Sequence, residues 1–527
     1  MIRSLPASPE RLTMPRHGRH RRSALVTVIV VVALLAACGP GGGGEGGAPV
    51  PDGELRIAAQ FAPRAGYAVD TDDAFVLTQL GATEALTAAA ADGQVRAALA
   101  ESWTQLDPLT WRFVLRPGVT FHDGSPVTPA AVATALRYVV GVAAPPRALR
   151  GLGLVVAEDG ADAVRVSTAQ PDPILPLRLS SPNAVILAPS AYGGATPSVF
   201  GTGTGPMRLV SAEGAQRAVL ERFDAYWGGR PALARVTATF VSDPAARALA
   251  LRAGDVDIAQ GLPESSLLEF SAGSGFDEQT APAPRTVSLL LNQSAAPFAD
   301  PRIRQAVARS LDRRALAEQA LAGSALPASE LFGPAVAWGA TDPPPAPDVE
   351  GARALLAQAG HGPDNPLRVR LWTYPVRAEL PTLATAVQAM LRDAGVEAEI
   401  RVGDYGTQEP ELIAGRYDMF LLSRSYLTDV PDAGATLRSD YTCDGSYNLN
   451  HYCSPAYDAL IATLDTTTDT AARQEVFRAA ARMLTEDVVG VPLVHSQENV
   501  VTSGVAGFVL DPFAKRLVTP QLAVTAG

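Results

Sequence analysis

The residue types that most often carry out chemistry are sparse in this chain of 527 residues. It contains three Cys, six His and a single lysine, Lys515. None of the spaced motifs HExxH, CxxC or GxSxG occurs. The lysine does not follow a glycine loop, which excludes a Walker A phosphate site. The sequence therefore contains no catalytic motif, although a Ser or Cys triad assembled from distant segments would escape this search and leaves an exported hydrolase open.

Two short stretches resemble ligand loops only in composition. "GTGTGP" (201–206) is rich in glycine, but it lacks the GxGxxG spacing and the helix start that phosphate binding needs, so a tight turn is favoured. "DTDD" (70–73) offers too few ligands for calcium. Each of the four histidines beyond the N-terminal region is more often a satisfied polar residue than a metal ligand: His122, His361, His451 and His495. We therefore predict neither a metal site nor a cofactor.

The N-terminal region is predicted to direct export. Four arginines within positions 16–22 come directly before an apolar run at 24–37, which is shorter than the ~20 residues of a membrane span. Residues 1–37 are thus interpreted as a signal peptide. The run closes on Leu-Ala-Ala-Cys, which resembles the lipobox of bacterial lipoproteins and implies that Cys38 is acylated. An ordinary signal peptide with an incidental cysteine is the alternative. Residues 38–53, rich in Gly and Pro, predict a flexible tether.

Charge and size limit the partners of the exported part. The net charge is −11, and basic residues concentrate in the first 22 positions, so the remainder is strongly acidic and repels nucleic acid. The length and a hydrophobic content of 47% predict two or three domains with a large core. In an oxidising compartment, the remaining pair Cys443 and Cys453 favours a disulfide, with two free thiols as the alternative.

Strand-like and helix-like segments alternate along the chain, which indicates an α/β fold. "TWRFVLR" (110–116) alternates apolar and polar side chains and predicts a strand. Thr128 followed by Pro129 is typical of a helix start, and Asp300 and Asp312 begin two further helices. The same periodicities predict helices over 348–359, 380–394 and 470–487 and strands over 367–373 and 397–402.

Four long blocks occur together in this chain. The first, 99–139, has a tryptophan-bearing strand, then "FHDG", then a helix. The second, 203–262, contains "GTGP", "YWGG" and "GDVD"; the third runs over 289–360; and the fourth, 415–461, includes both cysteines. In this order they resemble the family 5 extracellular solute-binding proteins, the peptide, opine and nickel receptors of ABC importers. The fourth block is most similar to the dipeptide-binding branch.

This resemblance implies the fold. It is the class II periplasmic-binding-protein fold of the large peptide-binding type, with two α/β lobes, a ligand cleft between them and an extra subdomain in lobe one. We expect lobe one at 54–285, lobe two at 286–494 and a C-terminal return to lobe one at 495–527. Closure of the lobes about hinge strands would trap the ligand. Such a receptor is not an enzyme.

The resemblance also implies a ligand anchor in "SYLTDVPD" (425–432). In peptide-binding members an aspartate of this loop receives the α-ammonium of the ligand, which assigns that role to Asp429, with Asp432 as the less favoured neighbour. An aspartate that only caps a turn is the alternative. Peptide binders have a tryptophan three residues earlier, where this chain has Tyr426, so a different ligand is open.

A second anchor is implied by "LWTYPVRAELPT" (371–382). It resembles the segment that, in the dipeptide branch, supplies an arginine to the C-terminal carboxylate of the ligand. Arg377 matches this position, and a guanidinium suits a carboxylate, although an exposed loop arginine is an equal alternative. Trp372, Tyr374 and Tyr405 are secondary candidates for lining the cleft.

The predicted function is a monomeric, lipid-anchored receptor on the extracytoplasmic face of the bacterial cell membrane. It would capture short peptides and deliver them to an ABC permease with its ATPase subunits. A receptor of the same fold for an opine, a nickel chelate or an oligosaccharide is the first alternative, and for nickel His451 would be a candidate ligand. The others are the exported hydrolase and a sensor that feeds no transporter.

Overall fold

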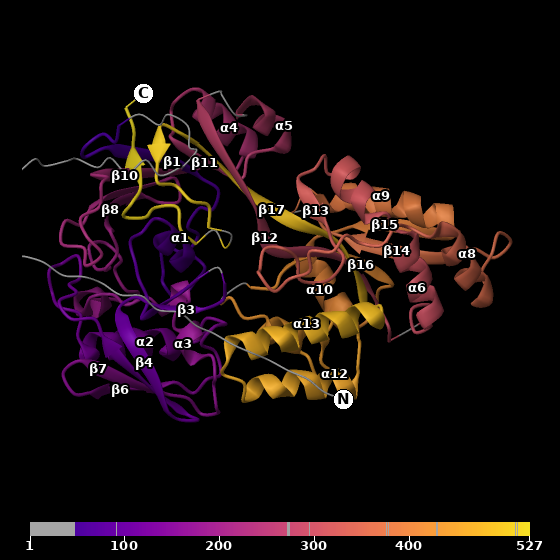
Figure 1. Ribbon diagram of the computed structural model, residues 1–527, viewed down its shortest axis with the longest axis horizontal. Coiled ribbons are helices and arrows are strands. Elements are labelled where there is room, and N and C mark those ends of the chain that lie inside the picture. The colour runs from indigo at the N-terminus through magenta and orange to yellow at the C-terminus, as the bar shows by residue number, and fades with distance from the viewer. Residues whose placement is uncertain are drawn as a thin grey trace, which may run out of the picture. The chain divides into compact units, whose positions relative to one another are not determined.

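The computed structural model describes residues 48–526 except 91, 271–274, 295, 376, 378, 428–429, 512 and 514. The predicted signal peptide, Cys38 and most of the predicted tether lie outside the described residues. Residues 46–527 form one compact unit, built on a mixed sheet of eleven strands (Figure 1). Within the described part of the chain, no helix is long and apolar enough to cross a membrane.

The large sheet is continuous from one half of the unit to the other. Its strands lie in the order β15 (Val396–Val402), β14 (Leu367–Thr373), β16 (Met419–Ser425), β12 (Phe276–Leu291), β17 (Gly490–Ser503), β11 (Ile258–Gln260), β1 (Glu54–Ala59), β10 (Arg235–Phe240), β9 (Arg217–Arg222) and β8 (Met207–Glu213), and β13 (Ala325–Pro327) pairs with β17. The antiparallel pair β12 and β17 lies at the centre and is longer than any other strand. This pair therefore connects the two halves.

Two separate apolar cores flank the central pair. One contains side chains of β1, β8, β9 and β10, together with Val500, Leu517 and Leu522 from the C-terminal end. The other contains the inner faces of β14 and β16 and of the helices α6 (Pro301–Ser310), α8 (Val349–Gln358) and α9 (Glu379–Ala394). The chain thus returns to its first core after β17, although the lobe boundaries given above stay a prediction.

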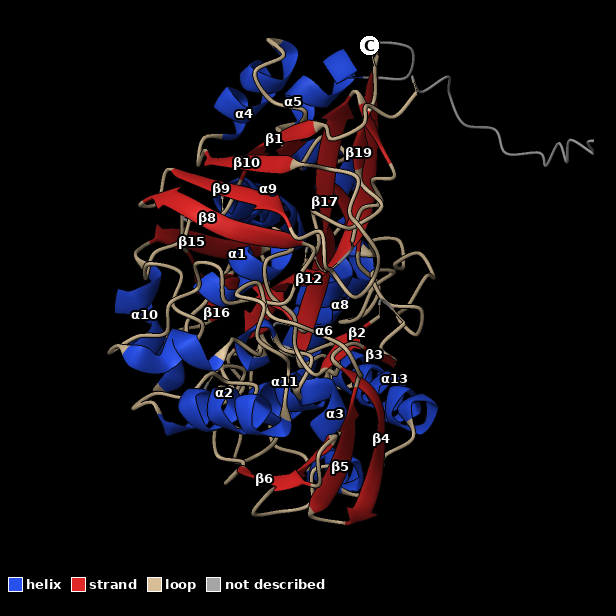
Figure 2. Ribbon diagram, turned by 90° about the vertical axis from the view of Figure 1, so that its left-hand side faces the viewer, coloured by secondary structure: helices blue, strands red, loops and turns tan. Residues whose placement is uncertain are grey.

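A third core belongs to a smaller unit formed by the first sequence block. The antiparallel strands β4 (Ala100–Asp107), β5 (Thr110–Leu115), β7 (Ala163–Ser167) and β6 (Val155–Asp159) make a sheet of their own. Helix α2 (Pro129–Gly141) packs on it (Figure 2). Thr128 caps α2 as predicted, since its hydroxyl accepts a hydrogen bond from the amide of Ala131 at 3.2 Å.

Most of the elements predicted from periodicity are present. Asp300 and Asp312 cap α6 and α7 (Arg313–Ala315), and α8, α9 and α13 (Thr470–Glu486) match the three predicted helices within one residue at each end. In "GTGTGP", a Cβ on Gly203 or Gly205 would collide with the carbonyl groups of Ala82 and Gly81. The glycines therefore allow two backbones to approach closely, and no helix begins there.

The fourth block forms a helical layer on the second half. Helices α11 (Gly434–Tyr441), α12 (Pro455–Ala462) and α13 share an apolar core with Tyr426 and Trp338. Cys443 and Cys453 are joined by a disulfide in the segment between α11 and α12. This bond closes the short loop that leads into α12.

Candidate ligand-binding site

The central strand pair has two irregularities of register, a small one between Val287 and Ser288 and a larger one between Pro282 and Thr286. Its register passes from Pro282 opposite Gln497 to Thr286 opposite His495, so three residues of β12 stand opposite Ser496 alone. The last of the three is Arg285. β-Bulges of this kind redirect side chains and occur often beside functional sites. The larger irregularity lies where the strand pair passes from one core to the other, which is the place expected of a hinge.

Arg285 is partly buried and only weakly engaged. Its Nη1 donates a hydrogen bond of 3.3 Å to the carbonyl oxygen of Ser423 on β16. The hydroxyl of Tyr374 approaches the same oxygen at 3.5 Å and accepts from the Ser423 amide at 3.3 Å. Burial lowers the pKa of Arg285 to about 10, and the nearby positive charge of Arg377 acts in the same direction. The guanidinium is therefore charged at neutral pH but poorly compensated.

Arg377 and two glutamates complete a cluster of charges at the hinge. Arg377 lies 3.9 Å from a carboxylate oxygen of Glu379 and keeps 38% of its side chain exposed. Glu498, on β17, is in electrostatic range of both arginines; burial raises its pKa, and the two arginines oppose that rise. The structure thus places the predicted carboxylate anchor, Arg377, beside a second arginine and two acids.

The predicted aromatic residues around this cluster pack mainly with one another. Tyr374 is buried, and its ring centroid lies 5.0 Å from that of Tyr405 and 5.9 Å from that of Phe420. The Tyr405 hydroxyl donates to Glu409 at 3.2 Å. Trp372 is half-buried against the second core, and its indole Nε1 has no hydrogen-bond partner among the described residues. Tyr374 is the one of the three that reaches the charged cluster.

The predicted ammonium anchor is not seen, because Thr428 and Asp429 lie outside the described residues. Its neighbours are structural. Asp432 is buried and forms an ion pair of 2.7 Å with Arg473, while its other carboxylate oxygen accepts from the amide of Gly434 at 2.9 Å. Tyr426 is 2% exposed and packs against Phe332 in the helical layer. The geometry of both residues favours a scaffold role over direct contact with a ligand.

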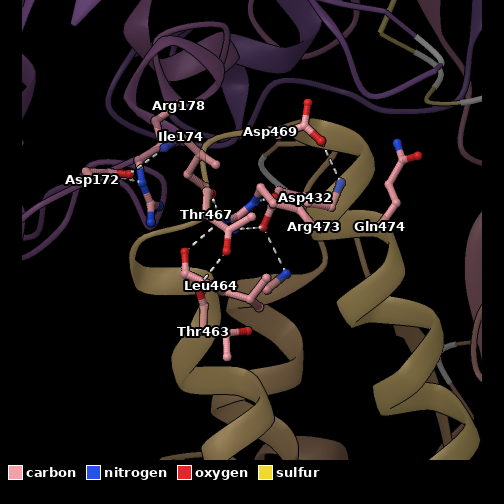
Figure 3. A network of polar contacts seen from close by, with 12 residues as sticks. Asp172, Ile174, Arg178, Asp432, Thr463, Leu464, Thr467, Asp469, Arg473 and Gln474 are labelled. Carbon is pink, nitrogen blue, oxygen red and sulfur yellow. Dashed lines mark hydrogen bonds and ion pairs between the residues drawn. The ribbon is translucent and has the colours of Figure 1, made fainter.

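Away from the hinge, the two halves touch each other a second time. Ile174 and Leu177, next to the small sheet, form an apolar cluster with Val430 of the other half, which Ala89 and Val95 cover in part. The side chain of Gln474 donates to the carbonyl of Asp92 at 3.2 Å. Figure 3 shows Ile174 on the side of Asp432, in the loop before α11, and of Arg473, in the first turn of α13. We call Ile174, Leu177 and Val430 the latch.

Two cavities lie along the latch and are lined from both sides. One, of about 480 Å³, has Asp172 and Arg178 on one side and Arg438 and Arg473 on the other. Each of these charged groups has a protein partner, as in the Arg178–Asp172 pair of 2.6 Å (Figure 3). The second cavity, of about 190 Å³, lies around Ile174, Leu177 and Pro431. The arginines that line the two cavities are all paired within the protein, and Asp444 of the first cavity accepts a hydrogen bond from the Thr442 hydroxyl at 3.0 Å. The latch is therefore suited to hold the halves together.

Leu177→Ala tests this role. Burial of a leucine stabilises the closed contact by about 1.5 to 3 kcal/mol, so the variant should close less readily and bind its ligand about tenfold more weakly or worse. Calorimetric titration measures the dissociation constant. Leu268→Ala is the matched control, because Leu268 is 83% exposed. Equal affinities of the two variants would contradict a latch.

A further cavity, of about 300 Å³, lies on the first half beside the C-terminal segment. Its wall includes the carboxylate of Glu84, which accepts hydrogen bonds from Tyr226 at 2.9 Å and from Trp227 at 3.0 Å. Burial raises the pKa of Glu84. Lys515 and Arg516 line the same cavity. The Tyr-Trp pair of the "YWGG" motif therefore satisfies the hydrogen bonds of a buried acid.

His451 and His495 make their contacts within the scaffold. His451 bonds the carbonyl oxygen of Leu412 at 3.2 Å. His495 is 2% exposed, and its Nδ1 lies 3.0 Å from the hydroxyl of Thr286. That hydroxyl donates to the carbonyl of Leu331 at 2.7 Å, so it must accept from Nδ1–H of His495. In the described part of the chain, no group of three or more His, Cys, Asp or Glu is placed to hold a metal ion.

His495 should make the hinge sensitive to acid. Burial lowers its pKa to about 4, whereas an unfolded histidine titrates near 6.5. As the pH falls from 7 to 5, the unfolded state takes up a proton that the folded state does not, which costs the fold about 2 kcal/mol. Urea unfolding at pH 7 and pH 5 should therefore show a smaller loss of unfolding free energy for His495→Asn than for the unmodified chain. The asparagine amide can still donate to Thr286. Parallel losses in both proteins would contradict this prediction.

Sequence inspection missed Arg285 and Glu498. Both are charged residues in strands with apolar runs: Arg285 begins "RTVSLLL", and Glu498 lies between the apolar ends of "VPLVHSQENVV". A charge inside such a strand is a signal, because burying it is costly unless it has a function or a partner. The bulge that places Arg285 depends on the pairing of distant segments and has no local signature.

Comparisons with known proteins find similar sequences over most of the chain. A family model described as "Bacterial extracellular solute-binding proteins, family 5 Middle" matches residues 94–448. The nickel-binding periplasmic protein of Escherichia coli (strain K12) is 28% identical over 448 residues, covering 78% of this chain and 83% of that protein. The probable di/tripeptide-binding protein 5 of Pseudomonas aeruginosa (strain UCBPP-PA14) is 28% identical over 466 residues, with coverages of 81% and 87%.

A solved structure extends the likeness to the fold. The crystal structure of the nickel ABC transporter protein from Bacillus halodurans superposes with a TM-score of 0.79 at 26% identity, over 90% of this chain and 100% of that one. The fold expected from the sequence, two α/β lobes of the periplasmic-binding-protein type, is thereby confirmed.

Proposed function

Because the chain belongs to family 5 of the bacterial extracellular solute-binding proteins, we propose that it is the receptor of an ABC importer for short peptides. It holds one ligand between its lobes, with lobe one at 54–285 and 495–527 and lobe two at 286–494. Its ligand is delivered to a permease and is not transformed. The binding lobes act as a monomer.

The observation that carries the peptide assignment is the cluster at the hinge. Arg377, the position implied for the carboxylate anchor, lies next to Arg285, so two guanidinium groups are available where β12 passes between the lobes. A guanidinium binds a carboxylate through paired hydrogen bonds. Asp429 is proposed as the partner of the ligand ammonium. Relatives named for di/tripeptides and for glutathione support a ligand with such groups.

A nickel chelate is the second candidate. The nickel-binding relative in E. coli is as similar as the di/tripeptide one, and a chelating organic acid would also present carboxylates to Arg285 and Arg377. This candidate needs no metal ligand from the protein itself. The two candidate functions therefore differ in the ligand but use the same arginines, Arg285 and Arg377, to bind its carboxylates.

The N-terminal lipid anchor is part of the proposal. Acylation of Cys38 would hold the receptor at the membrane through the tether at 38–53. A tether raises the effective concentration of a receptor near its transporter. Mass spectrometry of the mature N-terminus tests this step, and an unmodified Cys38 would contradict it.

Thermal unfolding of a chain that begins at Gly39 tests the ligand class. The scan includes dipeptides, longer peptides, opines, nickel with histidine, and oligosaccharides. A ligand at 100 times its dissociation constant adds about 2.7 kcal/mol to the free energy of unfolding, which raises the midpoint. Dipeptides are expected to raise it. If only another solute class does so, the chain is a receptor for that class.

A further inference from the structure

The starting observation is that two opposite charges at the hinge are both without an ion pair. Within the part of the chain that the structure describes, Arg285 has one hydrogen bond, to a neutral carbonyl, and Glu498 has none through its carboxylate. Arg377, by comparison, has Glu379 at 3.9 Å. A guanidinium carries five N–H donors, so most of those on Arg285 remain available.

The position of Glu498 follows from the alternation of side chains along β17. Side chains alternate along a strand, so Glu498 shares a face with Val494 and Val500. Val494 belongs to the core of the second half, and Val500 to the core of the first. Glu498 therefore lies on the stretch of β17 that passes between the two lobes, and the bulged Arg285 lies on the partner strand of the same stretch.

A third polar group at this place is also unsatisfied. The hydroxyl of Ser423 has no hydrogen-bond partner among the described residues, although Ser423 is only 6% exposed. The carbonyl of the same residue is the acceptor for Arg285. Buried polar groups without partners are rare in native proteins and call for an explanation. A polar ligand that enters from the cleft supplies one.

We propose that Arg285 and Glu498 form a charge-selective pair in the ligand site, in which Arg285 binds the carboxylate of the ligand and Glu498 binds a cationic group next to it. The inference rests on the proposed function and narrows it to a substrate class, peptides with a basic residue at the carboxyl end. A second carboxylate at the same place would face Glu498 and be rejected, because like charges repel strongly in a partly buried site.

Three dipeptides test the selectivity: Ala-Lys, Ala-Ala and Ala-Glu. Calorimetric titration of the chain that begins at Gly39 should give an affinity for Ala-Lys at least tenfold higher than for Ala-Glu. Glu498→Gln should reduce that ratio to about one. Arg285→Gln should weaken all three by tenfold or more, but should leave the binding of Ala-Lys amide, which lacks the free carboxylate, nearly unchanged.

Arg370→Gln is the matched control. Arg370 is also a strand arginine of the second half, but it already has a carboxylate partner, Asp418, at 2.9 Å. This variant should bind the three dipeptides like the unmodified chain. If Arg285→Gln behaves in the same way, the inference is wrong while the receptor function stands. If the unmodified chain binds none of the peptides, both this inference and the proposed peptide-receptor function are wrong.

Stability without ligand separates a binding role from a structural one. The double variant Arg285→Gln, Glu498→Gln removes two charges that make no ion pair, so its thermal midpoint should be equal to that of the unmodified chain or higher. A clear loss of stability in the double variant would assign both residues to the scaffold and overturn the inference.

Discussion

Replacement of Asp432 by Ala is expected to lower the free energy of unfolding by about 3 to 5 kcal/mol. The Asp432 and Arg473 side chains are each only 5% exposed, and both carboxylate oxygens accept from the guanidinium, at 2.7 and 3.0 Å. Arg473 also donates to the carbonyls of Leu464 and Thr467 (Figure 3). Loss of the carboxylate leaves a buried positive charge without its partner. Urea unfolding measures the change.

The control for this prediction is an exposed pair in the same layer. Arg438 and Asp465 keep 46% and 61% of their side chains exposed, so Asp465→Ala should cost less than about 1 kcal/mol. Asp432→Leu combined with Arg473→Met should recover much of the lost stability, because no charge is then left buried. Equal losses for Asp432→Ala and Asp465→Ala would show that burial does not strengthen the first pair.

Asp429→Asn should weaken the binding of a dipeptide by about 10- to 150-fold. A hydrogen bond between an ammonium and a carboxylate is worth about 1.5 to 3 kcal/mol, which corresponds to that ratio of dissociation constants. The variant should also lose the ability to distinguish a free peptide from its N-acetylated form. Calorimetric titration of both peptides measures the two effects.

Asp364→Asn is the control for the ammonium anchor. Asp364 is exposed, so the same change of charge there should leave affinity unchanged. If Asp429→Asn binds free and acetylated peptides in the same ratio as the unmodified chain does, the ammonium is bound elsewhere.

The sequence was sufficient for elements whose signals are local. Thr128, Asp300 and Asp312 each begin a helix because a short oxygen-bearing side chain can accept from the backbone amides of the first turn. Helix α9 was found because its buried residues recur at the helical period. The overall fold followed from the order of the four blocks, which local physics alone would not have supplied.

The arrangement of the site could not be predicted in the same way. Arg285 and Glu498 are more than 200 residues apart in the chain, and they come within electrostatic range only because β12 and β17 pair with a bulge. From the sequence, Asp432 was a possible ligand group beside Asp429. Its actual partner, Arg473, could not be recognised, because it lies on a helix 41 residues further along the chain. Tyr426 likewise enters an aromatic core built from distant segments. Such pairings depend on tertiary packing, and no spacing in the sequence records them.

The central claim is that the chain retains a peptide without changing it. Equilibrium dialysis of the chain that begins at Gly39 against Ala-Lys, followed by mass spectrometry of the bound fraction, measures this directly. The account predicts one intact Ala-Lys per chain, released on unfolding. Recovery of free alanine and lysine would identify a hydrolase. A chain that retains no Ala-Lys but does retain a nickel chelate or a sugar would contradict the peptide assignment.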